Sequence, residues 1–191
     1  MESGIVMSQF NEKVVIVTGA SSGIGQATAI SFAKEGAKVC LADINEQGLA
    51  VTAAIIAKFG GETICVVTNV AKEDACKNMV DKTVAAFGAL HVIFNNAGIS
   101  GHEAPIGEQP TENWQRVLDI NLNGVFYCTK AALPEIEKSG GGVVINTASI
   151  YGLVGACNLS PYVAAKHAVI GLTKSTAMEY AAKNIRCVAV C

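Results

Sequence analysis

The sequence predicts an α/β fold of Rossmann type, a doubly wound parallel sheet with helices on both of its faces. Short runs rich in valine and isoleucine alternate with longer stretches of helix-forming residues. The short runs are almost continuously apolar, as expected for strands that helices cover on both faces. Strands that alternate with helices in this way are joined by right-handed crossovers. We expect residues 1–191 to form a single domain.

The expected elements follow from the lengths of the apolar runs. Runs of β-branched residues such as VVIV and VVINT are too short for helices, so we interpret them as strands. The expected strands are 14–17, 38–42, 63–67, 91–94, 143–147 and 186–191. The expected helices are 23–35, 46–59, 72–87, 112–138 (with a break near 121–124) and 161–182. The longest expected loop, 98–111, is polar and follows a central strand, where loops often cover an active site.

The composition is that of an ordinary globular domain. Of the residues, 51% are hydrophobic and 16% are charged, and the formal net charge is −2. No apolar run approaches the roughly 18 residues of a membrane span. Residues 1–12 have no basic segment before an apolar core, so we expect no signal peptide. The basic residues are scattered, which argues against a nucleic-acid or anionic-membrane partner.

The seven cysteines follow neither the pattern of a metal site nor that of a disulfide framework. Their number is odd, and the sequence has no CxxC pair and no nearby histidine cluster. We therefore expect no bound metal. We expect free, mostly buried thiols in a protein of the reducing cytoplasm.

A glycine-rich segment, TGASSGIG at residues 18–25, lies between the first expected strand and the first expected helix. Glycine permits a tight turn and lets the backbone approach a ligand closely. The helix that follows presents free N–H groups and a partial positive charge. The spacing is GxxxGxG, not the GxGxxG of many dinucleotide-binding folds, but the position between strand and helix indicates a pyrophosphate site.

Asp43 ends the second expected strand, 18 residues after Gly25. A carboxylate at this place can accept hydrogen bonds from the diol of an adenosine ribose, and it would repel a 2′-phosphate. Ser22 and Ile44, where a phosphate-binding cation could stand, are neutral. The chemistry therefore favours NAD over NADP. The alternative is that Asp43 is a solvated turn residue or a helix cap.

The segment SPYVAAKH at residues 160–167 places Tyr162 and Lys166 four residues apart, on one face of an expected helix. Ser160 can cap this helix, and Pro161 suits its first turn. Tyr162 is the only tyrosine of four that has a lysine four residues later. An ammonium beside a phenol favours the ionised phenolate, which would make Tyr162 an acid or base near neutral pH. The alternative is an accidental polar pair on the surface.

Taken together, six motifs resemble those of the short-chain dehydrogenase/reductase family. They occur in the family's order, and the match runs from about residue 12 to the end of the chain. They are TGASSGIG (18–25), Asp43, NNAG (95–98), Asn121 within INLNG, Ser149 within INTAS, and YVAAK (162–166). The resemblance implies an oxidoreductase with NAD(H) as its cofactor.

The resemblance also implies a catalytic role for four residues. Tyr162 would exchange a proton with the substrate oxygen while a hydride passes to or from the nicotinamide. Lys166 would favour the phenolate of Tyr162 and hold the nicotinamide ribose. Ser149 would hydrogen-bond the substrate oxygen. Asn121 would sit at a break in its helix and anchor a water that leads protons from Lys166 to solvent.

Other positions would bind the cofactor or line the substrate pocket. The positions implied for the cofactor, in addition to Tyr162 and Lys166, are Gly19, Ser21, Ser22, Gly23, Ile24, Gly25, Asp43, Asn69, Val70, Asn95, Ala97 and Gly98. The inferred wall of the substrate pocket is Ser149, Ile150, Leu153, Cys157 and Leu159. Because this wall is mostly apolar, it suits a hydrophobic or cyclic secondary alcohol better than a polyanion.

Three features depart from the family's pattern. Asn69 stands where the family usually has aspartate, and its carbonyl can still accept a hydrogen bond from an adenine amino group. His91 stands where aspartate often precedes NNAG, and we assign it a structural role. Family members usually run to roughly 250 residues, so the resemblance implies a further C-terminal segment that contacts the nicotinamide and covers the substrate. We expect the 191 residues to be a fragment of such an enzyme.

We therefore expect an enzyme that transfers a hydride between NAD(H) and a secondary alcohol or ketone. Two other activities of the same family stay open, the reduction of 3-oxoacyl thioesters and the oxidation of a sugar. A third alternative is an inactive NAD-binding scaffold. Similar proteins commonly form tetramers through helices that correspond to 161–182 and 124–138, so the resemblance implies a homotetramer.

Overall fold

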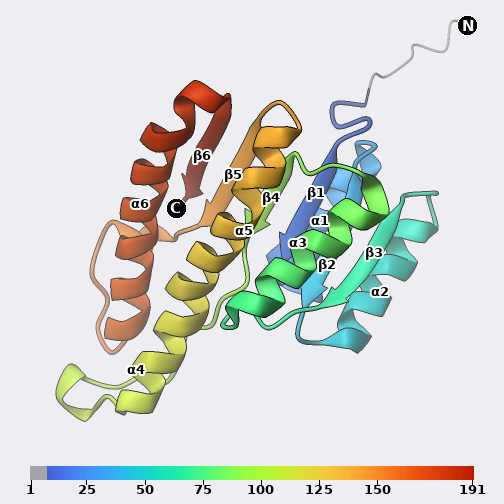
Figure 1. Cartoon of the computed structure of the whole chain (residues 1–191). Helices are drawn as coiled ribbons and strands as arrows, with labels where there is room; N and C mark the ends of the chain where they lie inside the picture. The colour runs from blue at the N-terminus through green and yellow to red at the C-terminus, as the bar shows by residue number, and fades with distance from the viewer. Residues whose placement is uncertain (1–7) are drawn as a thin grey trace, which may run out of the picture.

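The structure, a computed structural model that describes residues 8–191, contains one six-stranded parallel sheet (Figure 1). The strand order is β3-β2-β1-β4-β5-β6. The strands are β1 (Val14–Thr18), β2 (Lys38–Asp43), β3 (Thr63–Val67), β4 (Val92–Asn95), β5 (Gly142–Thr147) and β6 (Ile185–Val190). The prediction of a Rossmann-type doubly wound sheet is confirmed. Residues 1–7, on which most of the signal-peptide expectation rests, lie outside the described range.

Helices cover both faces of the sheet, as the apolar strands require. The helices are α1 (Gly23–Lys34), α2 (Glu46–Ala57), α3 (Glu73–Phe87), α4 (Thr111–Leu118), α5 (Gly124–Lys138) and α6 (Ser160–Tyr180). Helices α1 and α2 pack on one face, around a core that contains Leu41 and Leu49. Helices α3, α5 and α6 lie on the other face, in front of the sheet in Figure 1, around a core that contains Ile16, Met79 and Ile136.

The strand order reverses between β1 and β4, since β2 follows β1 on one side and β5 follows β4 on the other. Helices therefore leave the sheet in opposite directions at this point, and a crevice opens beyond the carboxyl ends of the two strands. Ligands of open α/β sheets bind in such a crevice. The topology thus places the glycine-rich turn after β1 and the NNAG segment after β4 at one edge of the sheet.

The predicted break near 121–124 is a local change of helix type and not an interruption of the helix. Residues Asp119–Asn123 form a π-helical turn that joins α4 to α5. A π-turn inserts one extra residue into the helix, and such turns are frequent at functional sites. Within residues 8–191, no helix is long and apolar enough to cross a membrane.

Candidate active site

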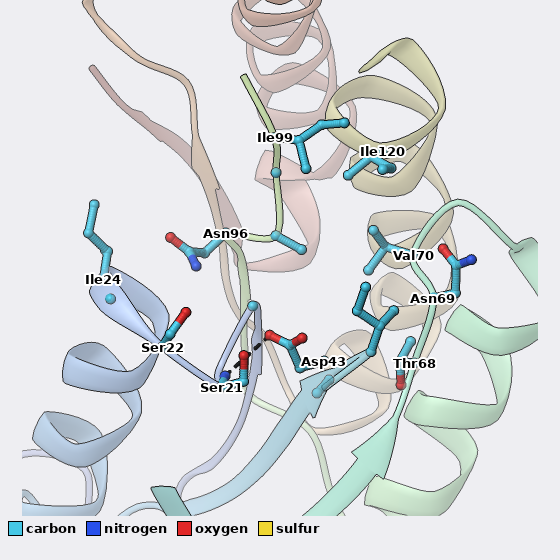
Figure 2. A pocket seen from close by; sticks show the side chains of 16 residues that line it. Ser21, Ser22, Ile24, Asp43, Thr68, Asn69, Val70, Asn96, Ile99 and Ile120 are labelled. Atoms are coloured by element: carbon cyan, nitrogen blue, oxygen red, sulfur yellow. Dashed lines mark hydrogen bonds between the residues drawn. The ribbon is translucent and has the colours of Figure 1, made fainter. Parts of the chain in front are cut away.

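Two adjoining cavities lie at the carboxyl edge of the sheet. The first, about 430 Å³, is lined by Gly19, Ser21, Ser22, Gly23, Ile24, Ala42, Asp43, Ile44, Thr68, Asn69, Val70, Asn96, Ala97, Gly98, Ile99 and Ile120 (Figure 2). The second, about 380 Å³, is lined by Ile24, Asn96, Gly98, Ile99, Ser100, Thr147, Ser149, Tyr151, Leu159, Tyr162 and Lys166. The two cavities share Ile24, Asn96, Gly98 and Ile99. An elongated ligand can therefore reach from Asp43 in the first cavity to Tyr162 in the second.

The glycine-rich turn leaves the start of α1 open toward the first cavity. Gly19 and Gly23 have φ of 70° and 54°, backbone conformations that favour glycine. A Cβ atom on Gly23 would meet no atom within 4 Å, so the space beside this glycine is free for a ligand. The Ser22 side chain makes no capping hydrogen bond, and the first turn of α1 has no acidic residue. The free N–H groups of this turn therefore suit a pyrophosphate. Gly25 does not line the cavity, and it allows α1 to pack against Gly19.

Asp43 projects from the end of β2 into the first cavity (Figure 2). Its carboxylate accepts hydrogen bonds from the backbone N–H groups of Ser21, at 3.2 Å, and Asn45, at 3.0 Å. These bonds fix the carboxylate beside the glycine-rich turn, and the oxygens keep further lone pairs for a ligand. No lysine or arginine of residues 8–191 lines this cavity. The residues present thus fit a dinucleotide with an unmodified ribose diol.

The two asparagines of NNAG face different ways, which corrects the placement of Asn95 at the cofactor. Asn95 is buried, and its Nδ2 donates to Thr129 Oγ1 at 3.0 Å and to Asn146 Oδ1 at 2.8 Å. Asn96 lines both cavities instead. Strand alternation explains the difference, because Asn95 shares the face of Ile93, which packs with α3 and α5. The same alternation, applied to β4 in the sequence, would have found Asn96.

Helix α6 brings Tyr162 and Lys166 to the second cavity. Lys166 is only 3% exposed, and its Nζ donates to the Thr147 carbonyl oxygen at 2.6 Å. The same Nζ lies 5.4 Å from the centroid of the Tyr162 ring. Burial lowers the pKa of Lys166 to about 8. A buried ammonium beside a phenol at a cavity does not fit the surface-pair alternative.

The start of α6 differs in one detail from the sequence prediction. Pro161 lies in the first turn as expected, but Ser160 is itself the first helical residue, and Leu159 occupies the capping position. The Ser160 hydroxyl is buried and has no hydrogen-bond partner among residues 8–191. Ser160 is therefore not the helix cap.

Ser149, at the end of the segment after β5, holds a strained backbone conformation. Its φ of 150° with ψ of 161° lies in a region that is nearly exclusive to glycine. Its Oγ lines the second cavity and accepts a hydrogen bond from the Tyr151 N–H at 3.2 Å. A strained residue that persists at a cavity indicates that the surrounding structure fixes the position of the hydroxyl.

This strain predicts a difference between two variants that both lack the hydroxyl. Ser149→Gly relieves a strain of about 1–3 kcal/mol, whereas Ser149→Ala keeps it. Glycine also adds backbone entropy to the unfolded state, of about 0.5–1 kcal/mol relative to alanine. We expect the glycine variant to unfold at the higher temperature and both variants to lose turnover. Thermal unfolding by circular dichroism measures the difference, and a glycine variant less stable than the alanine variant would contradict the strain.

Asn121, in the π-turn, fixes the loop that passes between the cavities. The residue is fully buried, with its Oδ1 accepting from the Ile99 N–H at 2.9 Å and its Nδ2 donating to the Ile99 carbonyl at 2.8 Å. Ile99 lines both cavities. The described contacts of Asn121 thus hold a cavity wall, and its predicted role in a proton relay stays a prediction.

Only part of the predicted substrate wall lines the second cavity. Ser149 and Leu159 do so. Ile150, Leu153 and Cys157 are exposed and outside the lining. Besides Asn96, the lining of the second cavity contains four residues that the sequence analysis did not predict, namely Ile99, Ser100, Thr147 and Tyr151. The 3₁₀ turn Ile150–Gly152, which gave no clear sequence signal, turns Tyr151 inward, with its ring edge-on to Tyr162 at 6.4 Å between centroids.

The motifs and the fold agree with the comparison to known proteins. The sequence model of the short chain dehydrogenase family matches residues 13–191. The chain belongs to this family. The cyclohexanol dehydrogenase of Acinetobacter sp. (strain SE19) is 47% identical over 182 residues, which are 95% of this chain and 72% of that protein. The 3beta-hydroxysteroid dehydrogenase of Mediterraneibacter gnavus (strain ATCC 29149 / DSM 114966 / JCM 6515 / VPI C7-9) is 41% identical, over 98% of this chain and 68% of that protein.

A solved structure of a relative gives the same fold. The crystal structure of NAD+-bound xylitol dehydrogenase matches with a TM-score of 0.92 at 39% identity, over 95% of this chain and 70% of that chain. The predicted family, the Rossmann-type fold and the enzyme class, an oxidoreductase that acts on CH–OH groups, are confirmed. This short-chain dehydrogenase thus spans about seven tenths of the length of these relatives.

Proposed function

We propose that this short-chain dehydrogenase transfers a hydride between NAD(H) and an apolar, cyclic secondary alcohol or the corresponding ketone. The observation that carries the proposal is the junction of the two cavities. Among residues 8–191, one cavity is lined by a glycine-rich turn and by a single carboxylate, Asp43. The other has Tyr162, Lys166 and Ser149 on its wall. A nucleotide bound in the first cavity would reach the second cavity, where Tyr162 would act as the acid/base.

The cofactor is NAD(H). In the part of the chain that the structure describes, no lysine or arginine lines the first cavity to bind a 2′-phosphate, and Asp43 would repel such a phosphate. The related xylitol dehydrogenase structure contains NAD+. The residues that would hold the cofactor are Gly19, Ser21, Ser22, Gly23, Ile24, Asp43, Asn69, Val70, Asn96, Ala97 and Gly98, together with Tyr162 and Lys166. When bound, the nicotinamide supplies the acceptor or donor of the hydride.

The chain's own residues supply the proton and the orientation. In the direction of alcohol oxidation, Tyr162 as phenolate would take the hydroxyl proton of the substrate, and in reduction it would return a proton to the carbonyl oxygen. The buried ammonium of Lys166 would favour the phenolate through space. Ser149 Oγ would hold the substrate oxygen in place by a hydrogen bond. The strain at Ser149 is consistent with a hydroxyl that is fixed before the substrate arrives.

The shape and polarity of the second cavity support the substrate class. Its wall includes Ile24, Ile99, Leu159 and Tyr151, and Lys166 is its one cation within residues 8–191. Cyclohexanol dehydrogenase and 3beta-hydroxysteroid dehydrogenase, the relatives named above, act by their names on ring alcohols. A polyanionic thioester or a polyhydroxylated sugar suits this wall less well. An inactive scaffold is disfavoured because Ser149, Tyr162 and Lys166 all reach one cavity.

A substrate panel tests this proposal. We expect NADH formation from NAD+ with cyclohexanol and with a 3β-hydroxysteroid, at a kcat/KM at least about tenfold above that for xylitol or a 3-hydroxyacyl thioester. The tenfold margin corresponds to about 1.4 kcal/mol, the scale of one or two buried methylene groups. Higher efficiency with the sugar or the thioester would overturn the substrate class, and no turnover of any substrate would favour the scaffold.

The cofactor preference depends on one carboxylate. We expect Asp43→Ala to weaken NAD+ binding and to lower the preference for NAD+ over NADP+ by about tenfold or more, because the variant lacks both the ribose acceptor and the negative charge. The ratio of kcat/KM values for the two cofactors measures the change. Ile44→Ala is the matched control, since Ile44 is a neutral neighbour on the same cavity wall. A wild-type enzyme that uses NADP+ as well as NAD+ would refute the assignment.

We propose further that the protein is a homotetramer of the cytoplasm. All seven cysteines are free thiols, which suits a reducing compartment. Two large apolar side chains remain exposed on the helices expected to meet, Phe126 on α5 and Met178 on α6, and Gly171 allows close approach to α6. Analytical ultracentrifugation at micromolar concentration should give a mass of four chains. A single monomeric species would contradict this part of the proposal.

A further inference from the structure

Two buried thiols that the proposed reaction does not use lie against each other between α3 and α5. The Sγ atoms of Cys76 and Cys128 are 3.4 Å apart, although the residues are 52 positions apart in the sequence. The residues are 0% and 1% exposed. Helices α3 and α5 lie side by side on the same face of the sheet, so the two sulfurs meet across a helix–helix contact (Figure 1).

The hydrogen bonds of this pair give the two sulfurs different roles. The Cys128 thiol donates to the sulfur of Cys76, and the Cys76 thiol lies 3.3 Å from the Val70 carbonyl oxygen. The bond from Cys128 lowers the pKa of Cys76, and the same bond raises the pKa of Cys128. Cys76 also lies near the start of α3, where the helix dipole favours a thiolate, while the Glu73 carboxylate in the same turn raises the Cys76 pKa and opposes it. Cys76 is thus the nucleophile of the pair, and Cys128 is the thiol that resolves the reaction.

We propose that Cys76 and Cys128 are a reversible modification site, a dithiol that closes to a disulfide and cross-links α3 to α5. A diazene oxidant such as diamide balances the reaction. The Cys76 thiolate adds to one nitrogen of the N=N bond, and Cys128 then attacks the Cys76 sulfur and displaces a hydrazine. The two thiols together lose two protons and two electrons, which the hydrazine carries away, and one S–S bond forms. A dithiol reductant reverses the step by thiol–disulfide exchange.

The cross-link requires a small movement and a route for the oxidant. A disulfide bond is about 2.05 Å long, so the sulfurs must approach by about 1.4 Å. The narrow space beside Cys128, lined in part by Val70, Ala97 and Gly124, is too small to hold a water molecule, so the approach requires a shift of the packed helices themselves. The capping residue of α3, Lys72, makes no side-chain capping bond. Opening of this uncapped first turn would expose Cys76 to a small oxidant.

The other five cysteines separate this proposal from general thiol oxidation. Cys65, Cys157 and Cys191 are exposed, so they can react between molecules. Cys40 on β2 and Cys187 on β6 are also buried, at 0% and 7% exposed, but β1, β4 and β5 lie between their strands. If burial alone decides which thiols react, all four buried thiols should stay unreacted. If proximity decides, the oxidant should link Cys76 to Cys128 and leave Cys40 and Cys187 as free thiols.

The experiment uses the chain with Cys65→Ser, Cys157→Ser and Cys191→Ser, treated with diamide below its unfolding temperature. We expect a mass loss of two hydrogens, two fewer titratable thiols in denaturant, and a Cys76–Cys128 linked peptide that a dithiol reductant separates. The unfolding temperature should rise by about 5–10 °C, the shift expected when a disulfide constrains the unfolded chain. Cys76→Ala should abolish the mass loss, and Cys40→Ala, the matched buried control, should retain it.

Three outcomes would overturn the proposed Cys76–Cys128 disulfide. Four free buried thiols after prolonged oxidation, or a linked peptide that forms only in denaturant, would mean that the 3.4 Å contact is packing alone. A link that involves Cys40 or Cys187 would equally overturn the proposal. If Cys76→Ala does not fold, the peptide map and the unfolding temperature of the background protein still decide. None of these readouts depends on dehydrogenase activity.

Discussion

Tyr162→Phe is expected to lower the turnover of any accepted alcohol by about 10² or more, the scale of general acid–base catalysis. The variant loses the transferable proton and keeps the ring, including the edge-on contact with Tyr151. We therefore expect NAD+ affinity within a few fold of wild type and an unchanged unfolding temperature. Steady-state kinetics with NAD+ and cyclohexanol, together with NAD+ titration by calorimetry, separate turnover from binding.

Tyr151→Phe is the matched control for this prediction. Tyr151 lines the same cavity and touches the same ring, but it has no ammonium beside it in the part of the chain that the structure describes. We expect its loss of a hydroxyl to change turnover by less than about tenfold. A Tyr162→Phe enzyme with wild-type turnover, or a Tyr151→Phe enzyme with the larger loss, would refute the assignment of Tyr162 as the acid/base.

The sequence determined the fold with small errors because its signals are local and repeated. Each strand is a short apolar run, and the observed bounds differ from the predicted ones by a residue or so, as for Val14–Thr18. The long helix was harder to predict, because the π-turn at Asp119–Asn123 keeps a helical pattern while it inserts one residue. The sequence shows a polar interruption at that place but not its geometry.

The site residues were predictable where a motif on a regular element fixes the backbone. They were less predictable where the conformation of a loop decides which side chains face the cavity. The glycine-rich segment, Asp43 and the Tyr162–Lys166 pair follow from residue types on regular elements. Of the site residues predicted there, all but Gly25 line the cavities, namely Gly19, Ser21, Ser22, Gly23, Ile24, Asp43, Tyr162 and Lys166. Ile150, Leu153 and Cys157 lie in or near a 3₁₀ turn whose direction no periodicity reports. The contact of Cys76 with Cys128 is tertiary, since 52 residues separate them.

Lys166→Met is expected to abolish turnover and, without cofactor, to make the folded protein more stable. The side chain is 3% exposed, and its ammonium has lost most of its hydration. Its pKa of about 8, against 10.5 for a free lysine, means that folding penalises the charged form. The full penalty, about 3 kcal/mol, applies at pH 7, where both the folded and the unfolded state are protonated. Methionine lacks the charge but leaves the Thr147 carbonyl without its donor, which costs about 1–3 kcal/mol. We therefore expect a net gain of about 1 kcal/mol.

The pH dependence distinguishes this cause from a general improvement in packing. A lysine with a lowered folded pKa makes the protein more stable as pH rises from about 8 toward 10.5, because the unfolded state then binds more protons. Lys166→Met lacks this group, so its advantage over wild type should shrink across that range while other titrating groups cancel in the difference. Urea unfolding at pH 7 and pH 9.5 measures this difference in unfolding free energy.

With saturating NAD+ the wild type should become more stable than Lys166→Met, since Lys166 would hold the nicotinamide ribose. If the variant is less stable than wild type at pH 7, or if its advantage grows with pH, then the buried charge of Lys166 does not destabilise the folded protein. If Lys166→Met is more stable than wild type only without cofactor and at neutral pH, then the wild-type chain keeps an ammonium that lowers its stability and that the reaction requires.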